Sequence, residues 1–207
     1  MNEILKYFPD INPEQTNKFR DLYSIYELWN SKINLISRKD FENLYTHHVI
    51  HSLSISKFIN FKNGTKVLDV GTGGGFPGVP LAILFPKVEF TLIDGIGKKI
   101  VAVNSIIKNL KINNAKGINI RAEDLSEKND FIVARAIGSL DKFYPLIQKN
   151  ILSNSFNDIN NGLIYLKGGD LSHELRQIKH YKEVLISDYF SEAFFKDKKI
   201  IYIPTTP

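Results

Sequence analysis

The sequence contains no cysteine, and its apolar runs are short. Without cysteine, the 207-residue chain has no disulfides, no thiolate metal ligands and no cysteine nucleophile. No run approaches the ~20 apolar residues that a membrane-spanning helix requires. The N-terminal segment MNEILKYFPD also lacks the basic start and the apolar stretch of a signal peptide. We therefore expect a cytoplasmic protein with no membrane partner.

Charge of one sign is only slightly in excess. The formal net charge is +5, and lysine outnumbers arginine 22 to 5. A modest basic excess agrees with a polyanionic partner but is weak support for one by itself. The arginines are the more informative cations, because the planar fork of arginine is hard to replace by lysine at a bound anion. They are Arg20, Arg38, Arg121, Arg135 and Arg176.

Glycine, by contrast, is concentrated in one place. An apolar run ending at Val70 leads into five glycines between residues 71 and 78, and Pro80 then favours a first helical turn. A strand, a glycine-rich turn and a helix let backbone N–H groups approach a nucleotide closely. Two templates fit this turn. Gly73, Gly75 and Gly78 match the dinucleotide fingerprint G-x-G-x-x-G, whereas Asp69, Gly71, Gly73 and Gly75 match the D-x-G-x-G-x-G of S-adenosylmethionine (SAM) methyltransferases.

The carboxylate of Asp69 separates the two templates. A negative charge at the end of the strand suits a ligand that carries an ammonium and a sulfonium, and it repels a pyrophosphate. We therefore expect SAM as the cofactor.

The patterns along the chain predict two parts, with Asn63 and Gly64 forming the turn between them. Residues 1–62 form a helical cap, in which Asn12 caps one helix and Asp40 caps a second. Residues 63–207 alternate between strand and helix patterns and form the cofactor-binding domain. Near the end we expect a helix over 171–180 and a strand pair over 183–187 and 199–204. The order predicts an α/β fold with a mostly parallel sheet and helices on both faces.

Ligands of open α/β sheets lie beyond the carboxyl ends of the strands, so residues at those ends should face one crevice. Asp94 follows the glycine turn by about one βαβ unit, where its carboxylate can accept the ribose hydroxyls, or alternatively cap the next helix. Ala122 and Glu123 end the third strand and could bind adenine, although an exposed Glu is ordinary there. Arg135 ends the fourth strand and is costly to bury unless it binds an anion, with a surface salt bridge as the alternative. Lys167 and Arg38 are the candidate substrate contacts, with a solvated side chain as the alternative for Lys167.

Three histidines lie close together at His47, His48 and His51. His47 and His51 have the spacing of two metal ligands on a helix, but no Glu follows His47 and no third ligand is nearby. We therefore expect helix packing or RNA contact, and no metal.

Taken together, these residues resemble the bacterial 16S rRNA guanine-N7 methyltransferase family, also called glucose-inhibited division protein B or methyltransferase G. The resemblance spans nearly the whole chain, and the extended loop with Phe-Pro-Gly is its specific part. Two residues depart from the family pattern, namely His51, where Asp is common, and Gly74, where proline is frequent. The matching positions include Asn34, Leu35, Ser37, Asp40, His48, Ser52, 69–73, 76–81, Asp94, Gly97, Lys98, Arg121, Glu123, Arg135, Ala136 and 166–168.

The resemblance implies a class I SAM-dependent, Rossmann-like fold with an N-terminal helical extension. It implies methylation of one guanine of 16S rRNA, within the 30S subunit or a precursor. It also implies cofactor contacts by Gly71, Phe76, Ala122, Glu123 and Arg135. With the glycines and the ribose-binding carboxylate added, the expected cofactor set is Gly71, Gly73, Gly75, Phe76, Asp94, Ala122, Glu123 and Arg135.

The implied chemistry needs no catalytic base. Guanine N7 carries an in-plane lone pair and no proton, so catalysis would come from alignment and electrostatic support. The N-P-P-Y segment of exocyclic amine methyltransferases is absent, because Ala134, Arg135 and Ala136 stand at the end of the fourth strand instead. This argues against transfer to adenine N6. Two alternatives remain open, a SAM methyltransferase for a small metabolite and a non-catalytic nucleotide-binding module.

Overall fold

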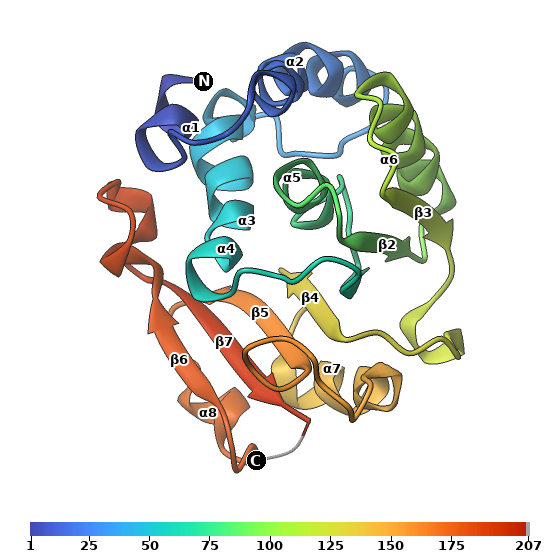
Figure 1. Ribbon diagram of the computed structural model, residues 1–207, viewed down its shortest axis with the longest axis vertical. Coiled ribbons are helices and arrows are strands. Elements are labelled where there is room, and N and C mark those ends of the chain that lie inside the picture. The colour runs from blue at the N-terminus through green and yellow to red at the C-terminus, as the bar shows by residue number, and fades with distance from the viewer. Residues whose placement is uncertain (206–207) are drawn as a thin grey trace.

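Five parallel strands form most of the sheet in the computed structural model, which describes residues 1–205 (Figure 1). Most of them are short apolar runs, as strands covered on both faces require. Two antiparallel strands extend the sheet, and the strand order is β3-β2-β1-β4-β5-β7-β6. The strands are β1 Lys66–Val70, β2 Glu89–Asp94, β3 Ala115–Asn119, β4 Phe131–Arg135, β5 Gly162–Gly168, β6 Lys182–Leu185 and β7 Lys198–Pro204.

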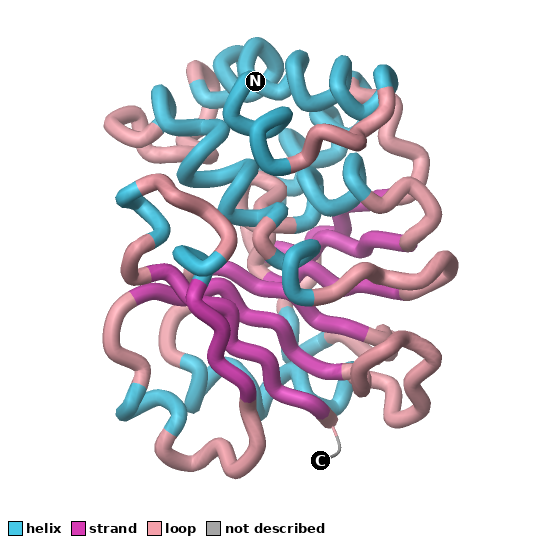
Figure 2. Tube along the Cα trace, turned by 60° about the vertical axis from the view of Figure 1, so that its left-hand side comes forward, coloured by secondary structure: helices cyan, strands magenta, loops and turns pink. Residues whose placement is uncertain are grey.

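Helices lie on both sides of this sheet, and most of them gather on one side (Figure 2). The α-helices are α1 Asn2–Tyr7, α2 Pro13–Asn30, α3 His51–Leu53, α4 Ile55–Phe58, α5 Gly78–Leu84, α6 Gly97–Asn109, α7 Leu140–Ile147 and α8 Ser172–Leu175. A π-helix, η2, spans Leu44–Ile50, and the 3-10 turns are η1 Phe41–Asn43, η3 Ala122–Asp124, η4 Gln148–Asn150, η5 Ile186–Asp188 and η6 Ala193–Phe195. No helix within residues 1–205 has the length and apolar character that crossing a bilayer demands.

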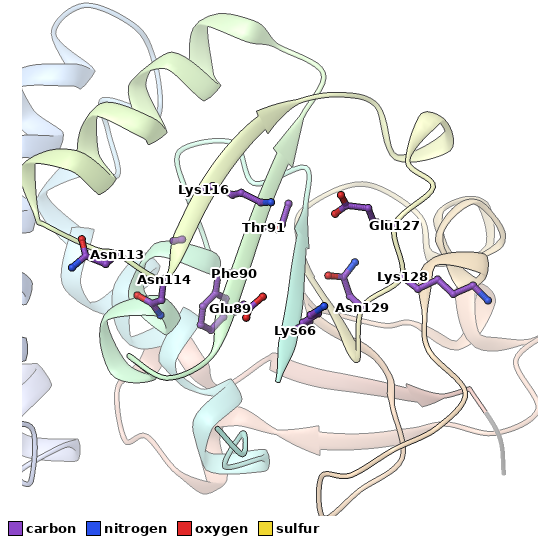
Figure 3. A pocket seen from close by; sticks show the side chains of 11 residues that line it. Lys66, Glu89, Phe90, Thr91, Asn113, Asn114, Lys116, Glu127, Lys128 and Asn129 are labelled. Carbon is purple, nitrogen blue, oxygen red and sulfur yellow. The ribbon is translucent and has the colours of Figure 1, made fainter. Parts of the chain in front are cut away.

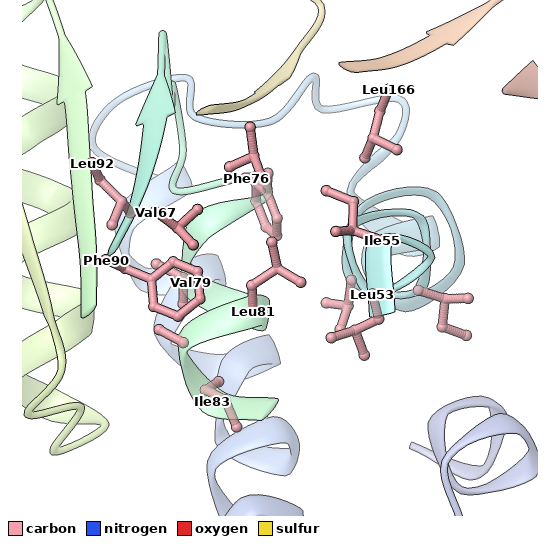
Figure 4. Close-up of a cluster of buried hydrophobic side chains, with 14 of the residues drawn as sticks. Leu53, Ile55, Val67, Phe76, Val79, Leu81, Ile83, Phe90, Leu92 and Leu166 are labelled. Atoms are coloured by element: carbon pink, nitrogen blue, oxygen red, sulfur yellow. The ribbon is translucent and has the colours of Figure 1, made fainter. Parts of the chain in front are cut away.

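Successive strand residues point to opposite faces, so each central strand contributes to two hydrophobic clusters. Val67 of β1 joins the cluster that contains α2, α5 and α6, whereas its neighbour Leu68 joins the cluster that contains α7 and α8. Figure 4 shows Val79 and Leu81 of α5 packed between the strands and the helical segment that carries Leu53. The expected α/β fold with helices on both faces is confirmed.

The N-terminal helices share the larger of these clusters with the sheet. Phe19 and Leu22 of α2 are fully buried there, and so is Leu53 of α3. The hydroxyl of Tyr7 in α1 donates a hydrogen bond at 2.7 Å to Glu192, which lies near the C-terminus. The first helices therefore pack on both the sheet and the segment before β7, and the boundary at residue 62 stays a prediction.

The helix caps test the sequence predictions directly. Asn12 caps α2 with a full capping box, in which Gln15 bonds back to the Asn12 backbone, as predicted. Asp40 makes no cap bond to η1, so its predicted capping role is wrong, because its carboxylate bonds two histidines instead. The helix predicted over 171–180 is also too long, since only Ser172–Leu175 is helical.

Candidate cofactor and substrate site

The glycine loop between β1 and α5 depends on backbone conformations that glycine tolerates best. Gly71, Gly73 and Gly75 have φ angles of +62°, +57° and +94°, in the left-handed region. A Cβ on Gly71 would lie 2.8 Å from the Ile137 side chain, and a Cβ on Gly75 would lie 2.7 Å from Val79. The loop therefore combines unusual backbone angles with close packing on two sides.

Asp94, at the end of β2, holds the loop in place. One carboxylate oxygen accepts a hydrogen bond from the Gly73 N–H at 3.0 Å, and the other accepts from the Ile96 N–H at 2.8 Å. The Thr72 N–H also bonds the Ile93 carbonyl at 2.9 Å. A carboxylate oxygen has lone pairs beyond one such bond, so Asp94 can still accept hydroxyl groups of a ligand.

These residues border a cavity of about 330 Å³ at the carboxyl ends of β1, β2 and β3, which we call the cofactor cavity. It brings together Gly71, Asp94, Ala122 and Glu123 of the expected cofactor set. Apolar side chains line much of the rest, as in most small-molecule sites. The other lining residues are Val70, Ile93, Gly95, Ile96, Ile120, Arg121, Ile137, Phe143 and Leu146.

Asp69 does not face this cavity, contrary to the interpretation of the sequence. Its side chain is fully buried beneath the loop, where it accepts hydrogen bonds from the Thr72 hydroxyl and the Gly78 N–H. The oxygen Oδ1 has no hydrogen-bond partner. Burial raises the pKa of Asp69 to about 7, although both hydrogen bonds and the charge of Arg135 act in the opposite direction. Asp69 therefore supports the loop from inside the protein.

Arg135 ends β4 and borders a second cavity, of about 410 Å³, which we call the basic cavity. Its guanidinium donates hydrogen bonds to the His47 carbonyl at 3.0 Å and to His48 Nδ1 at 2.9 Å. It also lies 5.1 Å from the centre of the Phe76 ring, within cation–π range. Burial lowers the pKa of Arg135 to about 10, which leaves it charged at neutral pH. The single crevice expected for all strand ends is thus two cavities.

Asp40 completes a network on the wall of the basic cavity. Its two carboxylate oxygens bond His47 Nδ1 at 2.5 Å and His48 Nε2 at 2.8 Å. Burial alone would raise the pKa of Asp40, but the two histidine bonds outweigh it and hold the pKa below its usual value. Burial, followed by the charge of Arg135, lowers the pKa of His48 to about 4. At neutral pH the network therefore contains a carboxylate, a neutral His48 and a cationic arginine.

Three of the expected cofactor residues, Gly73, Gly75 and Phe76, border neither cavity. The Phe76 ring is buried, stacks on Tyr26 at 5.0 Å and is tilted against His48 at 5.3 Å. The Tyr26 hydroxyl reaches the loop and donates a hydrogen bond to the Gly74 carbonyl at 2.7 Å. Residues of α2 and η2 therefore also pack against the glycine loop.

The two candidate substrate contacts differ in position. Lys167 is the penultimate residue of β5 and borders the basic cavity, where its ammonium donates to the Gly138 carbonyl at 2.7 Å and pairs with Glu174 at 3.0 Å. Arg38 is exposed and borders a separate hollow formed with Glu27 and Phe41. The structure thus groups Lys167 with Arg135 and leaves Arg38 in neither cavity.

The sequence patterns missed several residues that build these walls. Ile137 and Phe143 line the cofactor cavity, but they come from the loop and helix after β4, outside any glycine motif. Asp40 was expected to cap a helix, whereas its actual partners are His47 and His48. The proximity of Asp40 to three histidines in sequence was the available signal. Among residues 1–205, no group of three or more His, Asp and Glu side chains is placed to hold a metal ion.

A larger cavity, of about 490 Å³, lies at the opposite ends of the parallel strands (Figure 3). Its lining includes Lys66, Glu89 and Lys116, which lie at the amino ends of β1, β2 and β3. Ligands of α/β sheets bind beyond the carboxyl ends. The larger volume therefore does not make this cavity the stronger candidate.

Comparisons with solved structures agree with the fold. A precorrin-6y C5,15-methyltransferase from Geobacter metallireducens matches with a TM-score of 0.55 and 11% identity, covering 82% of this chain and 90% of that chain. A variant of MtNAS, solved in complex with S-adenosylmethionine, matches with a TM-score of 0.56 and 10% identity, covering 92% of this chain and 76% of its own. At such low identity these matches show the fold alone, and they agree with the expected Rossmann-like α/β fold.

Comparisons with known sequences are more specific. A protein named ribosomal RNA small subunit methyltransferase G from Flavobacterium psychrophilum is 49% identical over 204 residues, covering 99% of this chain and 98% of that protein. A protein of the same name from Bacteroides thetaiotaomicron is 50% identical over 204 residues, with 98% of each chain covered. The model of the GidB family matches residues 15–200. The chain therefore belongs to the GidB family, described as rRNA small subunit methyltransferase G.

Proposed function

We propose that this protein methylates N7 of a guanine in 16S rRNA, within the 30S subunit or a precursor, with SAM as the methyl donor. Membership of the rRNA small subunit methyltransferase G family supports the substrate class. The observation that carries the proposal is the pairing of two cavities at the carboxyl ends of adjacent strands. One is largely apolar and bordered by Asp94, and the other contains the charged Arg135. Acting on ribosomes, the protein would work in the cytoplasm.

The residues of the cofactor cavity suit SAM chemically. The carboxylate of Asp94 would accept the ribose hydroxyls, while the Ala122 N–H and the Glu123 carboxylate would bind the adenine edge. The positive-φ glycines Gly71 and Gly73 leave the backbone open to the ligand on the loop side. Gly75 and Phe76 border neither cavity, and the Phe76 ring centre lies 5.1 Å from the guanidinium of Arg135, which borders the basic cavity. We assign all three residues to the place where the reactive end of the cofactor meets the substrate.

SAM, when bound, supplies a methyl group made electrophilic by its sulfonium. Guanine N7 has a lone pair in the plane of the ring, so this chain need not provide a base. Arg135 has N–H groups beyond those bonded to His47 and His48, and these can donate to guanine O6 while N7 remains free. A fixed guanidinium next to O6 would hold the base in line and stabilise the charge that develops on it.

The lysine and arginine outside the reacting centre would bind the backbone of the RNA. Lys167 borders the same cavity as Arg135, so its ammonium is suited to a phosphate next to the target guanine. Arg38 is exposed on the N-terminal part and suits a phosphate farther along the RNA. Such contacts add affinity and position the substrate without reading its sequence.

Methyl transfer to isolated ribosomal subunits tests the proposal. Purified protein is incubated with tritiated SAM and 30S subunits from a strain that lacks the modification. We expect label in 16S rRNA, and borohydride reduction followed by aniline should cleave the chain at one 7-methylguanosine. Subunits from the parent strain, which already carry the methyl group, are the matched control and should take up little label. Naked 16S rRNA, assayed in parallel, identifies the form of the substrate.

Three outcomes would reject the proposal. Labelled 16S rRNA that aniline does not cleave would show that the methyl group is on an atom other than guanine N7. Label found only on a small molecule would indicate a metabolite methyltransferase. Calorimetric binding of NAD in preference to S-adenosylhomocysteine, without any transfer, would indicate a non-catalytic nucleotide-binding module.

A further inference from the structure

The geometry around Arg135 determines the tautomer of His48. A guanidinium only donates hydrogen bonds, so Nδ1 of His48, 2.9 Å from Arg135, must be the acceptor. The proton of a neutral imidazole then lies on Nε2, which donates to an Asp40 oxygen at 2.8 Å. The lowered pKa of His48 agrees with a neutral ring. Asp40, His48 and Arg135 thus form a directed chain of hydrogen bonds.

The far end of this chain is anchored in the same way. The second oxygen of Asp40 bonds His47 Nδ1. The His47 ring stacks on Phe194 of η6, with ring centres 3.8 Å apart and an angle of 14° between the planes. The His47 carbonyl accepts the other bond from Arg135. The guanidinium is therefore held at two points by adjacent residues of one helix, and that helix is held by the segment before β7.

The helix that delivers these groups has π geometry from Leu44 to Ile50. A π-helix is rarer than an α-helix and is frequent at functional sites, because its extra residue per turn redirects a carbonyl and side chains. Here it places the His47 carbonyl and the His48 ring on the same guanidinium. The cluster is only partly buried, with 35% of the Asp40 side chain and 14% of the His48 side chain exposed, and charged groups paired in such positions contribute little net stability. The cluster therefore calls for an explanation beyond stability.

We propose that Asp40 and His48 are positioning residues that hold the Arg135 guanidinium in a fixed direction toward the target guanine. The proposal rests on the proposed function, because it assigns a task to the same basic cavity. Asp40 fixes the tautomer of His48, and His48 then offers Arg135 a lone pair instead of an N–H group. Without that lone pair, Arg135 would lose one of its two anchors and rotate among several directions.

The test compares substitutions that remove the lone pair with one that restores it. His48→Leu removes the acceptor, whereas His48→Asn returns an amide oxygen close to the position of Nδ1. Asp40→Ala frees the tautomer of His48. Tyr45→Phe is a matched structural control in the same π-helix, because it loses the hydroxyl bonds to the Phe19 and Arg20 carbonyls. Each variant is assayed for kcat and KM on 30S subunits, for S-adenosylhomocysteine affinity and for Tm.

We expect kcat to fall at least about tenfold in His48→Leu and Asp40→Ala, as for other residues that orient a functional group. Affinity for S-adenosylhomocysteine should change little, since Asp40 and His48 do not line the cofactor cavity. His48→Asn should regain most of the lost kcat. Tyr45→Phe should lower Tm while its kcat stays close to that of the wild type.

Nitrogen-15 NMR of histidine-labelled protein reads the tautomer without any substrate. We expect His48 Nε2 to be protonated and Nδ1 to be unprotonated at neutral pH, and the two forms to mix in Asp40→Ala. A wild-type His48 protonated on Nδ1 would overturn the proposal, and so would a His48→Asn variant no better than His48→Leu. An equal loss of kcat in Tyr45→Phe would reduce the network to a structural role. Failure of the wild-type protein to methylate 30S subunits would reject the proposed function itself, while the NMR result would still report on the chain of bonds.

Discussion

The two cavities at the carboxyl ends of the strands are built in different ways. The cofactor cavity is formed by a backbone turn and the strand ends beside it, and the carboxylate of Asp94 at its border accepts hydrogen bonds from backbone N–H groups. The basic cavity is formed by side chains from distant segments, because Arg135 of β4 meets His47 and His48 of the N-terminal part. The cofactor cavity therefore depends on glycine backbone, whereas the basic cavity depends on charged and polar side chains from segments that are distant in sequence.

This difference teaches where each kind of substitution should act. Changes in the glycine loop should alter ligand affinity, because the backbone itself forms the surface. Changes in the Asp40 network should alter turnover, because they leave the cofactor cavity intact. Asp69 and Tyr26 connect the two regions. Burial raises the pKa of Asp69 and the charge of Arg135 opposes this rise, while the Tyr26 hydroxyl donates a hydrogen bond to the Gly74 carbonyl. Substitutions at these two positions test how independent the regions are.

The largest effect is expected for Gly73→Asp. Gly73 has a φ of +57°, which residues with a side chain rarely adopt, so the substitution strains the backbone. Its N–H also bonds the Asp94 carboxylate, so a second carboxylate at this position would be repelled. Affinity for SAM should fall about a thousandfold, or ~4 kcal/mol, by calorimetry. Gly64→Asp is the control, because Gly64 also has positive φ but lies in an open turn. Normal affinity in Gly73→Asp would remove the glycine loop from the proposed site.

The next effect is a pH dependence of stability that comes from Asp69. Burial raises its folded pKa to about 7, whereas the unfolded chain loses this proton near its ordinary value of 3.8. The folded protein therefore keeps a proton that the unfolded chain has lost, so this contribution to stability falls as pH rises from about 4 to about 7 and is then constant.

Asp69→Asn cannot ionise and lacks that decline. Relative to the wild type, its free energy of unfolding should rise by roughly 2 to 4 kcal/mol between pH 4 and pH 8, measured by urea denaturation. His48 and His51, whose lowered pKa values act with the opposite sign, are present in both proteins and cancel in the difference. Parallel stability curves for the two proteins would contradict the buried, raised pKa of Asp69.

Tyr26→Phe should have a smaller effect that spans both regions. It removes the hydroxyl that bonds the Gly74 carbonyl in a buried position and leaves that acceptor unpaired. The free energy of unfolding should drop by about 1 to 3 kcal/mol, with a several-fold loss of SAM affinity because the loop is less fixed. Tyr45→Phe, which loses comparable bonds away from the loop, should lose stability alone. Equal SAM affinities in Tyr26→Phe and Tyr45→Phe would show that the contact between α2 and the glycine loop does not affect cofactor binding.

The smallest effect is expected for Asn12→Ala, at the start of the helix that carries Tyr26. The substitution breaks the capping bond from the Gln15 N–H and should cost about 1 kcal/mol of stability in thermal or urea unfolding. SAM affinity and kcat should stay as in the wild type, because neither Asn12 nor Gln15 borders either cavity. A change in either quantity would mean that α2 transmits strain to the glycine loop.

The strand ends were predictable because their signals are local. A run of apolar residues that stops at a glycine cluster predicts the turn after β1, and the same alternation predicts Asp94 and Arg135 at later strand ends. The partners of each side chain at a strand end could not be predicted from neighbouring residues in the sequence. Asp69 and Arg135 both looked like crevice residues, yet one is turned under the loop and the other toward η2.

By itself, the sequence determined the α/β fold, the glycine turn and the order of strand ends, because periodicity and glycine content act within a few residues. Only the tertiary structure decided that the strand ends divide into two cavities and that Asp40 binds histidines instead of capping a helix. The reason is physical: a buried charge takes the partner that the packed fold brings within hydrogen-bond distance, and that partner can lie anywhere along the chain.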